Sequence, residues 1–335
     1  VRARAPELAN VLVNAGVSIA LALLGLGVWS LAAGFIAGSW VQVALLWRLT
    51  RFRPRLRVDL AVLRRYLSFG WPLYLSFLLS WGYLNADYYL VGSGLGEVEL
   101  GLYYLAFNIS QVPLQARFIL SRVAYPAFSR LRGDAAALGR AYAGATRYAL
   151  ALAGGVCAVG IGLAEPAIFL LLGERWLPAA PALRVLFLST LIRTGLGFNG
   201  ELLTSLGKTL AVLAATGAAL VTLLALGPAM MARWGIVGMA GAVCASSLVS
   251  AGLSSLVIAR HLRVNYPGAI GPAAACAAPI AAAGLWWSDR IHGLAHLVLA
   301  GALLLAAYVI LYAGLFDRPL ARHLWRRVRP AGAGR

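Results

Sequence analysis

Residues 209–231 read TLAVLAATGAALVTLLALGPAMM, a run of 23 residues without a charged side chain. A helix of about 20 apolar residues crosses a hydrocarbon core of about 30 Å, so this run predicts a transmembrane helix. Similar runs recur along the whole sequence. We expect ten spans, at 9–25, 28–47, 67–91, 100–121, 148–172, 182–205, 209–231, 235–258, 268–287 and 293–315. The chain is therefore predicted to be an all-α, polytopic membrane protein with about ten transmembrane helices.

The composition agrees with a membrane protein. Of the 335 residues, 61% are hydrophobic and only 12% are charged, whereas soluble domains carry about 25% charged residues. The mean hydropathy is +0.81. These values exclude a soluble enzyme, a secreted disulfide scaffold and a disordered chain. The three cysteines lie in apolar runs without metal-ligand spacing, so we expect them to be small buried hydrophobic residues.

The distribution of basic residues predicts the orientation of the chain. Of the 29 Lys and Arg residues, 23 lie in the terminal segments and one alternating set of connections, and 3 lie in the other set. Because basic residues accumulate on the cytoplasmic side, we expect both termini in the cytoplasm. The formal charge of +18 is thus interpreted as a topology signal and as contact with anionic lipids, not as a nucleic-acid interface.

Two predicted turns suggest an internal repeat. Gly27-Val-Trp-Ser-Leu-Ala-Ala-Gly34 and Gly235-Ile-Val-Gly-Met-Ala-Gly-Ala242 are 208 residues apart, and both begin with Gly and a β-branched residue. If they correspond, one repeat unit has six spans and the other retains only two, which predicts an N-terminally truncated fourteen-span protein. The expected segments are the last two helices of an N-terminal lobe (1–48), a basic cytoplasmic linker (49–66), a six-helix C-terminal lobe (67–260), two additional helices (261–316) and a basic cytoplasmic tail (317–335).

Motifs along the chain resemble those of a known family. They are Phe69-Gly-Trp-Pro72, Asn85-Ala-Asp-Tyr-Tyr-Leu-Val-Gly92, Leu100-Gly-Leu-Tyr-Tyr-Leu-Ala-Phe-Asn108, Pro113-Leu-Gln115, Pro126-Ala-Phe-Ser-Arg-Leu131, Gly173-Glu-Arg-Trp176, Asn199-Gly200 and Gly235-Ile-Val-Gly238. In their order and spacing they resemble the Wzx-type polysaccharide flippases of the multidrug/oligosaccharidyl-lipid/polysaccharide exporter superfamily, and most closely its lipopolysaccharide-exporter branch. The resemblance implies two six-helix lobes around a central cavity.

The resemblance also implies a function. Such a protein is not an enzyme. It moves lipid-linked oligosaccharides, carried on undecaprenyl pyrophosphate, across the bacterial cytoplasmic (inner) membrane by alternating access, for lipopolysaccharide, capsule or exopolysaccharide biosynthesis. Its expected partners are a polysaccharide polymerase and glycosyltransferases. No cofactor is expected, and coupling to protons or sodium ions is left open.

Two other functions are compatible with a polytopic chain. One is a multidrug or cation antiporter of the same superfamily, which would favour acidic over basic residues in its cavity. The other is a membrane glycosyltransferase or polymerase, which the short predicted outer loops disfavour. No nucleotide-binding loop, nucleophile elbow or zinc-protease motif occurs in the sequence. His292 and His296 have metal-compatible spacing, but only Asp289 is near enough to be a third ligand, so we expect no metal site.

Polar side chains inside the spans are the candidate site residues, because a charge at the bilayer centre costs about 2.5–3.5 kcal/mol even on insertion scales. Asn85 and Asp87 close the span 67–91. One interpretation is a helix-end cap or a carboxylate exposed at the interface. The other, which the resemblance supports, is a protonatable or cation-binding carboxylate that faces the cavity.

A second group lies in the span 100–121. Asn108, Gln111 and Gln115 are three and four residues apart, which predicts a polar stripe on one helical face. The stripe would bind either neighbouring helices or sugars, and Pro113 is expected to bend the helix. Arg117 lies about half a turn away. It either extends to the interface or binds an anionic pyrophosphate or acidic sugar.

A third group lies in the span 182–205, where Gly195, Gly197 and Gly200 are expected to loosen the helix. Arg193 and Glu201 are two turns apart on a regular helix, so an internal ion pair is one prediction; otherwise Arg193 is a cationic cavity residue. Asn199 completes the set of candidate cavity residues. In the preceding span, Glu165-Pro166 is expected to end a helix beside the outer surface.

Overall fold

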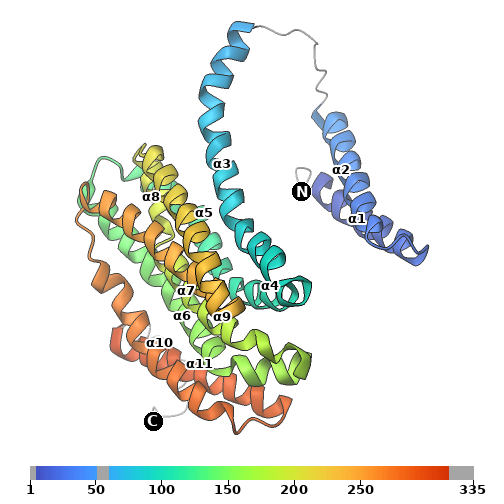
Figure 1. Cartoon of the computed structure of the whole chain (residues 1–335). Helices are drawn as coiled ribbons and strands as arrows, with labels where there is room; N and C mark the ends of the chain where they lie inside the picture. Colours follow the sequence, from blue (N-terminus) through green and yellow to red (C-terminus); the bar gives the residue numbers. More distant parts are fainter. Residues whose placement is uncertain (1–4, 51–59, 317–335) are drawn as a thin grey trace, which may run out of the picture. The chain divides into compact units, whose positions relative to one another are not determined.

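The computed structural model describes residues 5–50 and 60–316, which form helices and turns with no strand among them (Figure 1). The helices are α1 (Ala5–Leu23), α2 (Trp29–Thr50), α3 (Leu60–Leu95), α4 (Glu97–Gln111), α5 (Leu114–Arg130), α6 (Ala135–Leu172), a 3₁₀ helix (Glu174–Ala179), α7 (Ala180–Gly195), α8 (Phe198–Ser205), α9 (Thr209–Ala259), α10 (Tyr266–Ser288) and α11 (Leu294–Phe316).

The predicted all-α, polytopic fold is confirmed. Seven described segments are long and apolar enough to cross a membrane: Ala5–Leu23, Trp29–Leu49, Ala135–Leu172, Glu174–Ser205, Thr209–Ala259, Tyr266–Ser288 and Leu294–Phe316. The segment Thr209–Ala259 holds two predicted spans. The other two predicted spans, 67–91 and 100–121, are helical but fall outside this set, and both carry candidate polar residues.

Contacts divide the chain into two units, residues 1–70 and 71–335. The first unit contains the hairpin of α1 and α2. A Cβ atom added to Gly38 would lie 2.8 Å from the Asn10 carbonyl oxygen, so the glycine lets the two helices approach closely. Asn10 also donates a hydrogen bond to Gln42 Oε1 at 2.7 Å. The predicted tail 317–335 and the residues 51–59 of the predicted linker lie outside the described residues.

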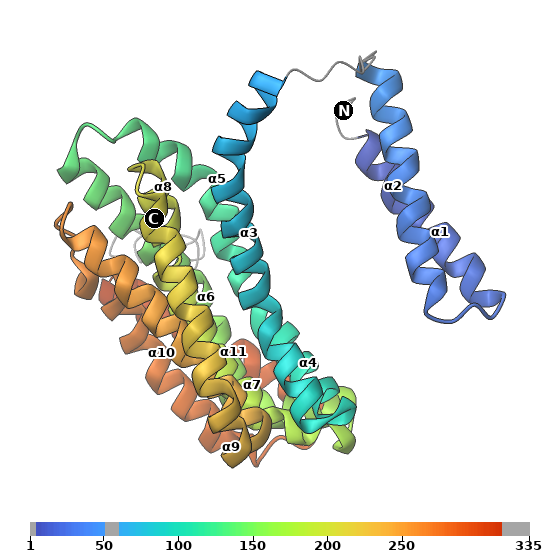
Figure 2. The same cartoon turned by 45° about the horizontal axis from the view of Figure 1, so that its top comes forward.

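The second unit is organised around α6, which packs against α5, α7, α10 and α11 (Figures 1 and 2). Small residues allow this packing. A Cβ atom on Gly162 would lie 2.7 Å from the Cα atom of Gly284, so α6 and α10 approach backbone to backbone. The side chain of Tyr308 on α11 packs directly against Gly154 and Gly155 of α6, which have no side chain to displace it. In hydrocarbon, where lipid is as apolar as leucine, such close packing supplies much of the association energy.

Two predicted spans are broken inside the second unit. The span 100–121 is divided into α4 and α5 at Val112 and Pro113, where Pro113 has no N–H to continue the α4 ladder. The bend predicted at Pro113 is therefore confirmed. The span 182–205 is divided into α7 and α8 at Leu196 and Gly197, within the predicted glycine-rich stretch.

One predicted helix end is wrong. Pro166 lies inside α6, which continues to Leu172. Neighbouring helices can compensate for the backbone bond that a proline removes from a transmembrane helix. Glu165 pairs with Arg184 of α7 at 3.0 Å, and 58% of its side chain is exposed.

A sharp turn divides α9 at Trp234 and Gly235. A Cβ atom on Gly227 would lie 3.3 Å from the Cε atom of Met239, so residues on either side of the turn come into contact. Gly235 has a φ of 56°, and Gly27, its counterpart in the predicted repeat, has a φ of 53°. Both glycines thus have a positive φ, which glycine adopts without steric cost. The repeat itself stays a prediction.

The turn gives a prediction for stability. With a φ of 56° and a ψ of −138°, Gly235 lies in a region that residues with a side chain rarely adopt, so Gly235→Ala should cost about 1–3 kcal/mol. Thermal unfolding of the purified chain in detergent, followed by loss of the monodisperse peak, should show a lower Tm.

Gly252→Ala is the matched control. Gly252 lies in the second half of α9 with no atom within 4 Å of an added Cβ, and alanine is the better helix former by about 1 kcal/mol. Its Tm should stay unchanged or rise. Equal destabilisation by both substitutions would contradict the assigned turn.

Candidate functional site

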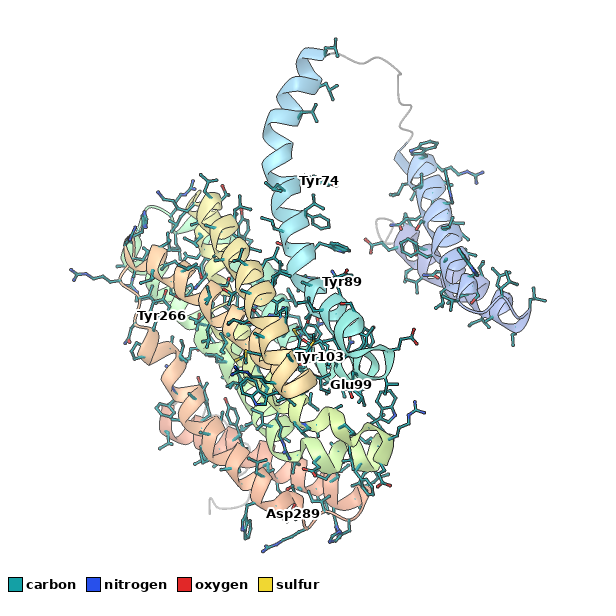
Figure 3. All side chains as sticks on the ribbon, viewed as in Figure 1. Tyr74, Tyr89, Glu99, Tyr103, Tyr266 and Asp289 are labelled. Carbon is teal, nitrogen blue, oxygen red and sulfur yellow. The ribbon has the colours of Figure 1, made fainter. Side chains whose placement is uncertain are left out.

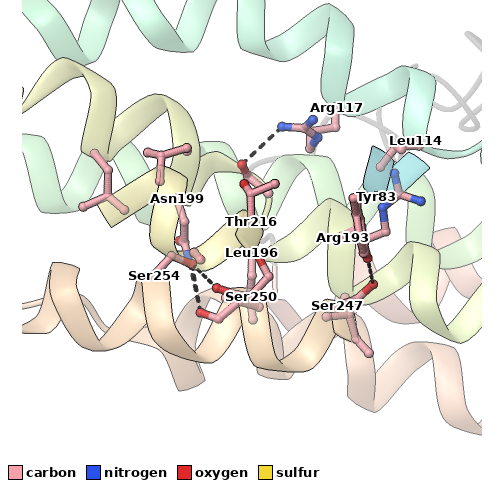
Figure 4. Close-up of a pocket in the computed structure, with 17 residues that line it drawn as sticks. Tyr83, Leu114, Arg117, Arg193, Leu196, Asn199, Thr216, Ser247, Ser250 and Ser254 are labelled. Atoms are coloured by element: carbon pink, nitrogen blue, oxygen red, sulfur yellow. Dashed lines mark hydrogen bonds between the residues drawn. The ribbon is translucent and has the colours of Figure 1, made fainter. Parts of the chain in front are cut away.

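A polar cavity of about 200 Å³ lies inside the second unit, among α3, α5, α7, α8 and α9 (Figure 4). Two guanidinium groups face it from different helices, Arg117 of α5 and Arg193 of α7. Hydroxyl and amide groups form most of the remaining polar wall. They belong to Tyr83, Asn199, Thr216, Ser247, Ser250 and Ser254.

Arg117 is held at the break between α7 and α8. Its Nη1 atom donates to the Gly197 carbonyl oxygen at 3.2 Å and to Glu201 Oε1 at 2.9 Å. Ser121, one turn further along α5, donates to the same Glu201 oxygen at 2.8 Å. A Cβ atom on Gly197 would lie 2.7 Å from the Arg117 Cδ atom. The lack of a side chain at Gly197 therefore leaves room for the Arg117 side chain to pack over the break between α7 and α8. The Arg117 Nε atom is buried without a hydrogen-bond partner.

Arg193 is the second cation of the cavity. Its Nη1 atom donates to Gln111 Oε1 at 3.2 Å, at the last residue of α4. Among the described residues, no carboxylate lies within 4.0 Å of Arg193. The predicted ion pair between Arg193 and Glu201 is therefore wrong. The break at Gly197 changes the helical phase between them, and Glu201 pairs with Arg117 instead.

Asn199 connects three helices through its side-chain amide. Its Oδ1 atom accepts a hydrogen bond from the Tyr142 hydroxyl of α6, and its Nδ2 atom donates to Ser254 at 2.8 Å and Ser255 at 3.0 Å on α9. Only 2% of Asn199 is exposed. A buried polar group without a hydrogen-bond partner is costly. The bonds of Asn199 therefore hold α8 against α6 and α9.

Asp87 is buried in the contact between α3 and α4, outside the residues that line the cavity. Its Oδ2 atom accepts from the Tyr103 hydroxyl at 2.8 Å, and its Oδ1 atom accepts from the Tyr88 backbone N–H at 3.0 Å. Only 2% of the residue is exposed, so the carboxylate is not on the surface. Figure 3 labels Tyr103 among the inner side chains of this contact. Among the described residues, no hydrogen bond or ion pair joins Asp87 to Arg193.

The predicted single stripe of Asn108, Gln111 and Gln115 is divided by the break between α4 and α5. Gln111 contacts Arg193, whereas Asn108 and Gln115 are exposed on the second unit. Asn108 donates back to the Tyr104 carbonyl of its own helix. Asn85 likewise donates to the Trp81 carbonyl of α3. For Asn85, Asn108 and Gln115 a role in binding remains a prediction.

Some cavity residues were missed at the sequence level. Ser247, Ser250 and Ser254 on α9 are three and four residues apart, the same spacing that identified the α4 stripe. Thr190 of α7 was also missed. It does not line the cavity, but it donates a hydrogen bond of 2.9 Å to the Ser110 carbonyl oxygen near the end of α4. No group of His, Cys, Asp or Glu side chains that could hold a metal ion occurs in the described part of the chain.

The sequence has relatives of recorded function. Residues 3–181 match the family described as polysaccharide biosynthesis protein. The chain belongs to this family. The chain is also 29% identical over 160 residues to the teichuronic acid biosynthesis protein TuaB of Bacillus subtilis, covering 47% of this chain and 33% of the relative. It is 28% identical over 184 residues to the succinoglycan biosynthesis transport protein ExoT of Rhizobium meliloti, covering 54% of this chain and 37% of the relative.

The matched segments thus span about a third of the length of these two polysaccharide biosynthesis proteins. The fold of this family member is also similar to that of lipid II flippase MurJ in an inward closed conformation. The TM-score is 0.70 at 14% identity, over 95% of this chain and 68% of the other. This likeness shows the fold, and it agrees with the predicted all-α, polytopic architecture.

The site gives a second prediction for stability. Asn199→Ala should leave the buried Tyr142 hydroxyl without its acceptor and remove the bonds from α8 to Ser254 and Ser255, and an unsatisfied buried group costs about 1–3 kcal/mol. The Tm of the purified chain should fall by several degrees. Asn108→Ala removes the same amide from an exposed position and should change stability by less than about 0.5 kcal/mol. Similar losses from both variants would contradict the role assigned to Asn199.

Proposed function

We propose that this chain acts in a flippase that moves anionic, lipid-linked oligosaccharides across the cytoplasmic membrane for the biosynthesis of a surface polysaccharide. The observation that carries this proposal is Arg193, a guanidinium with no carboxylate partner among the described residues, in a hydroxyl-lined cavity inside an apolar helical bundle. An unpaired charge there is costly and marks a functional site. A polyprenyl pyrophosphate headgroup supplies the matching anion.

The charges of the cavity favour an anionic ligand over a cationic one. Glu201 neutralises Arg117 at 2.9 Å, so the remaining charge is that of Arg193. Guanidinium groups bind phosphate oxygens in a bidentate fork. The serines of α9 and Asn199 offer hydroxyl and amide groups for sugar hydroxyls. A multidrug or cation antiporter would require the opposite balance of charge.

The broken helices suggest how the headgroup is handled. A helix break at membrane depth is tolerated where it lines a polar cavity, and both breaks lie beside this one. A phosphate that reaches Arg117 has to replace Glu201 as its anionic partner. The lipid tail stays in the bilayer while the two faces of the protein open alternately, and Gly197 and Pro113 are the points at which α7–α8 and α4–α5 can bend.

The relatives support the same function by their recorded names, which refer to teichuronic acid biosynthesis, succinoglycan transport and lipid II flipping. We propose undecaprenyl pyrophosphate as the carrier, with a polymerase and glycosyltransferases as partners. The asymmetry of the basic residues supports an inner-membrane protein with both termini in the cytoplasm. We propose transport and not catalysis as the activity of this chain.

Arg193 provides the test of this function. Arg193→Ala should lower by about 10- to 100-fold the rate at which a lipid-linked oligosaccharide becomes accessible outside proteoliposomes, because a charge-assisted hydrogen bond contributes about 1.5–3 kcal/mol. Arg193→Lys should retain part of the rate. Arg184→Ala is the control, since Arg184 pairs with the exposed Glu165. Full activity of Arg193→Ala would contradict the proposal.

Asp87 provides a separate test of coupling. We propose that this carboxylate couples transport to protons or sodium ions, because only 2% of Asp87 is exposed and an ionisable side chain buried in a membrane-spanning bundle marks a functional site. Asp87→Asn should remove the dependence of the transport rate on an imposed proton or sodium gradient, while gradient-free transport persists. Asp289→Asn, at the exposed end of α10, should leave that dependence intact. If Asp87→Asn responds to the gradient like the unmodified chain, Asp87 is not the coupling group.

A further inference from the structure

We infer that a second, separate pocket in this protein binds the phosphate of an anionic phospholipid headgroup. The pocket lies between the first turns of α6 and the connection from α9 to α10, and it has a volume of about 490 Å³. Its polar lining consists of Arg140 on α6 and of His261, Arg263 and Asn265 in the connection. The rest of its wall is made of alanine and glycine residues of α6.

The charge of this pocket is positive and uncompensated. Arg140 and Arg263 are exposed, and neither forms an ion pair within the described part of the chain. No acidic residue lines the pocket. The His261 Nδ1 atom lies 2.9 Å from the Val257 carbonyl oxygen; donation from Nδ1 leaves Nε2 free for a ligand. Asp134, the acidic residue just before α6, uses its Oδ1 atom to cap the Ala137 N–H at 2.9 Å.

The backbone adds to this positive potential. Both α6, with 38 residues, and α10, with 23, begin at the pocket, and helix N-termini carry a partial positive charge. Gly139 brings the two elements together, because a Cβ atom there would lie 3.1 Å from the Arg263 carbonyl oxygen. Figure 3 labels Tyr266 in the first turn of α10, next to the connection that carries Arg263.

Hydropathy places the pocket at the depth of lipid headgroups. Its α6 residues, 135–143, precede the apolar span predicted from residue 148, and Asn265 precedes the span predicted from residue 268. The connections at this end belong to the basic set, which is the side where anionic lipids attract Lys and Arg. Basic pockets between helices on that side are suited to lipid phosphates.

An apolar path next to the pocket favours a lipid over a soluble phosphate. Along α6, two turns beyond Arg140, Tyr148, Leu152 and Val156 follow at four-residue intervals, and all three are exposed. A phosphodiester held by Arg140 and Arg263 would leave its acyl chains to run along this row. Such a lipid would join α6 to the start of α10 and stabilise the packing of the last two helices.

The test compares the full chain in nanodiscs of phosphatidylcholine alone and of phosphatidylcholine with phosphatidylglycerol. Because a ligand that binds only the folded state raises stability, phosphatidylglycerol should raise the Tm of the unmodified chain by about 2–4 °C. The double variant Arg140→Gln/Arg263→Gln should lose this rise. The double variant Arg122→Gln/Arg130→Gln removes the same charge from exposed positions on α5 and should keep it. Native mass spectrometry should show fewer retained phosphatidylglycerol molecules for the first variant only.

Two outcomes would overturn the inference. Equal losses in the two double variants would show a general charge effect without a site. An equal rise in Tm when inorganic phosphate or glycerol phosphate is added to phosphatidylcholine nanodiscs, lost in Arg140→Gln/Arg263→Gln, would show a site for soluble phosphate and not for a lipid. Neither outcome depends on transport activity, so the inference can fail while the proposed function stands.

Discussion

The contact between Arg117 and the break in α7–α8 is the interaction on which the rest of the cavity depends. In a membrane, each backbone carbonyl released by a broken helix needs a partner inside the protein. Arg117 supplies that partner to Gly197 at 3.2 Å and binds Glu201 with the same nitrogen. At the other break, Thr190 donates to the Ser110 carbonyl. Each broken helix therefore supplies a hydrogen-bond donor to a backbone carbonyl of the other. These polar backbone groups can lie within the membrane because their partners are inside the protein.

This arrangement also determines the charge of the cavity. Once Glu201 is engaged by Arg117 and Ser121, Arg193 is left with an amide partner, Gln111. One positive charge thus remains among hydroxyl groups in an apolar bundle, which is the chemistry needed to hold a pyrophosphate with attached sugars. Membership of the polysaccharide biosynthesis protein family agrees with this chemistry.

Much of the fold could be predicted from the sequence, because helices in a bilayer follow hydropathy and length. The bend at Pro113 was also predictable, since proline lacks an N–H. The pairing of Arg117 with Glu201 was not, because it joins residues 84 positions apart and depends on a break that shifts the helical phase. The serines of α9 that line the cavity were missed, although their spacing of three and four residues is visible in the sequence. The burial of Asp87 beside Tyr103 could not be predicted, because it depends on how α3 packs on α4.

The proposed function requires a cavity that is open to water and attracts anions through Arg193. It is tested most directly by Ser250→Cys in a chain whose three native cysteines are replaced by alanine. Rates of labelling by sulfonate- and trimethylammonium-bearing methanethiosulfonates are measured, each normalised to its rate with free cysteine. We expect faster normalised labelling by the anionic reagent, and Arg193→Gln should abolish this preference. Faster labelling by the cationic reagent, or a preference unchanged by Arg193→Gln, would contradict the proposed function.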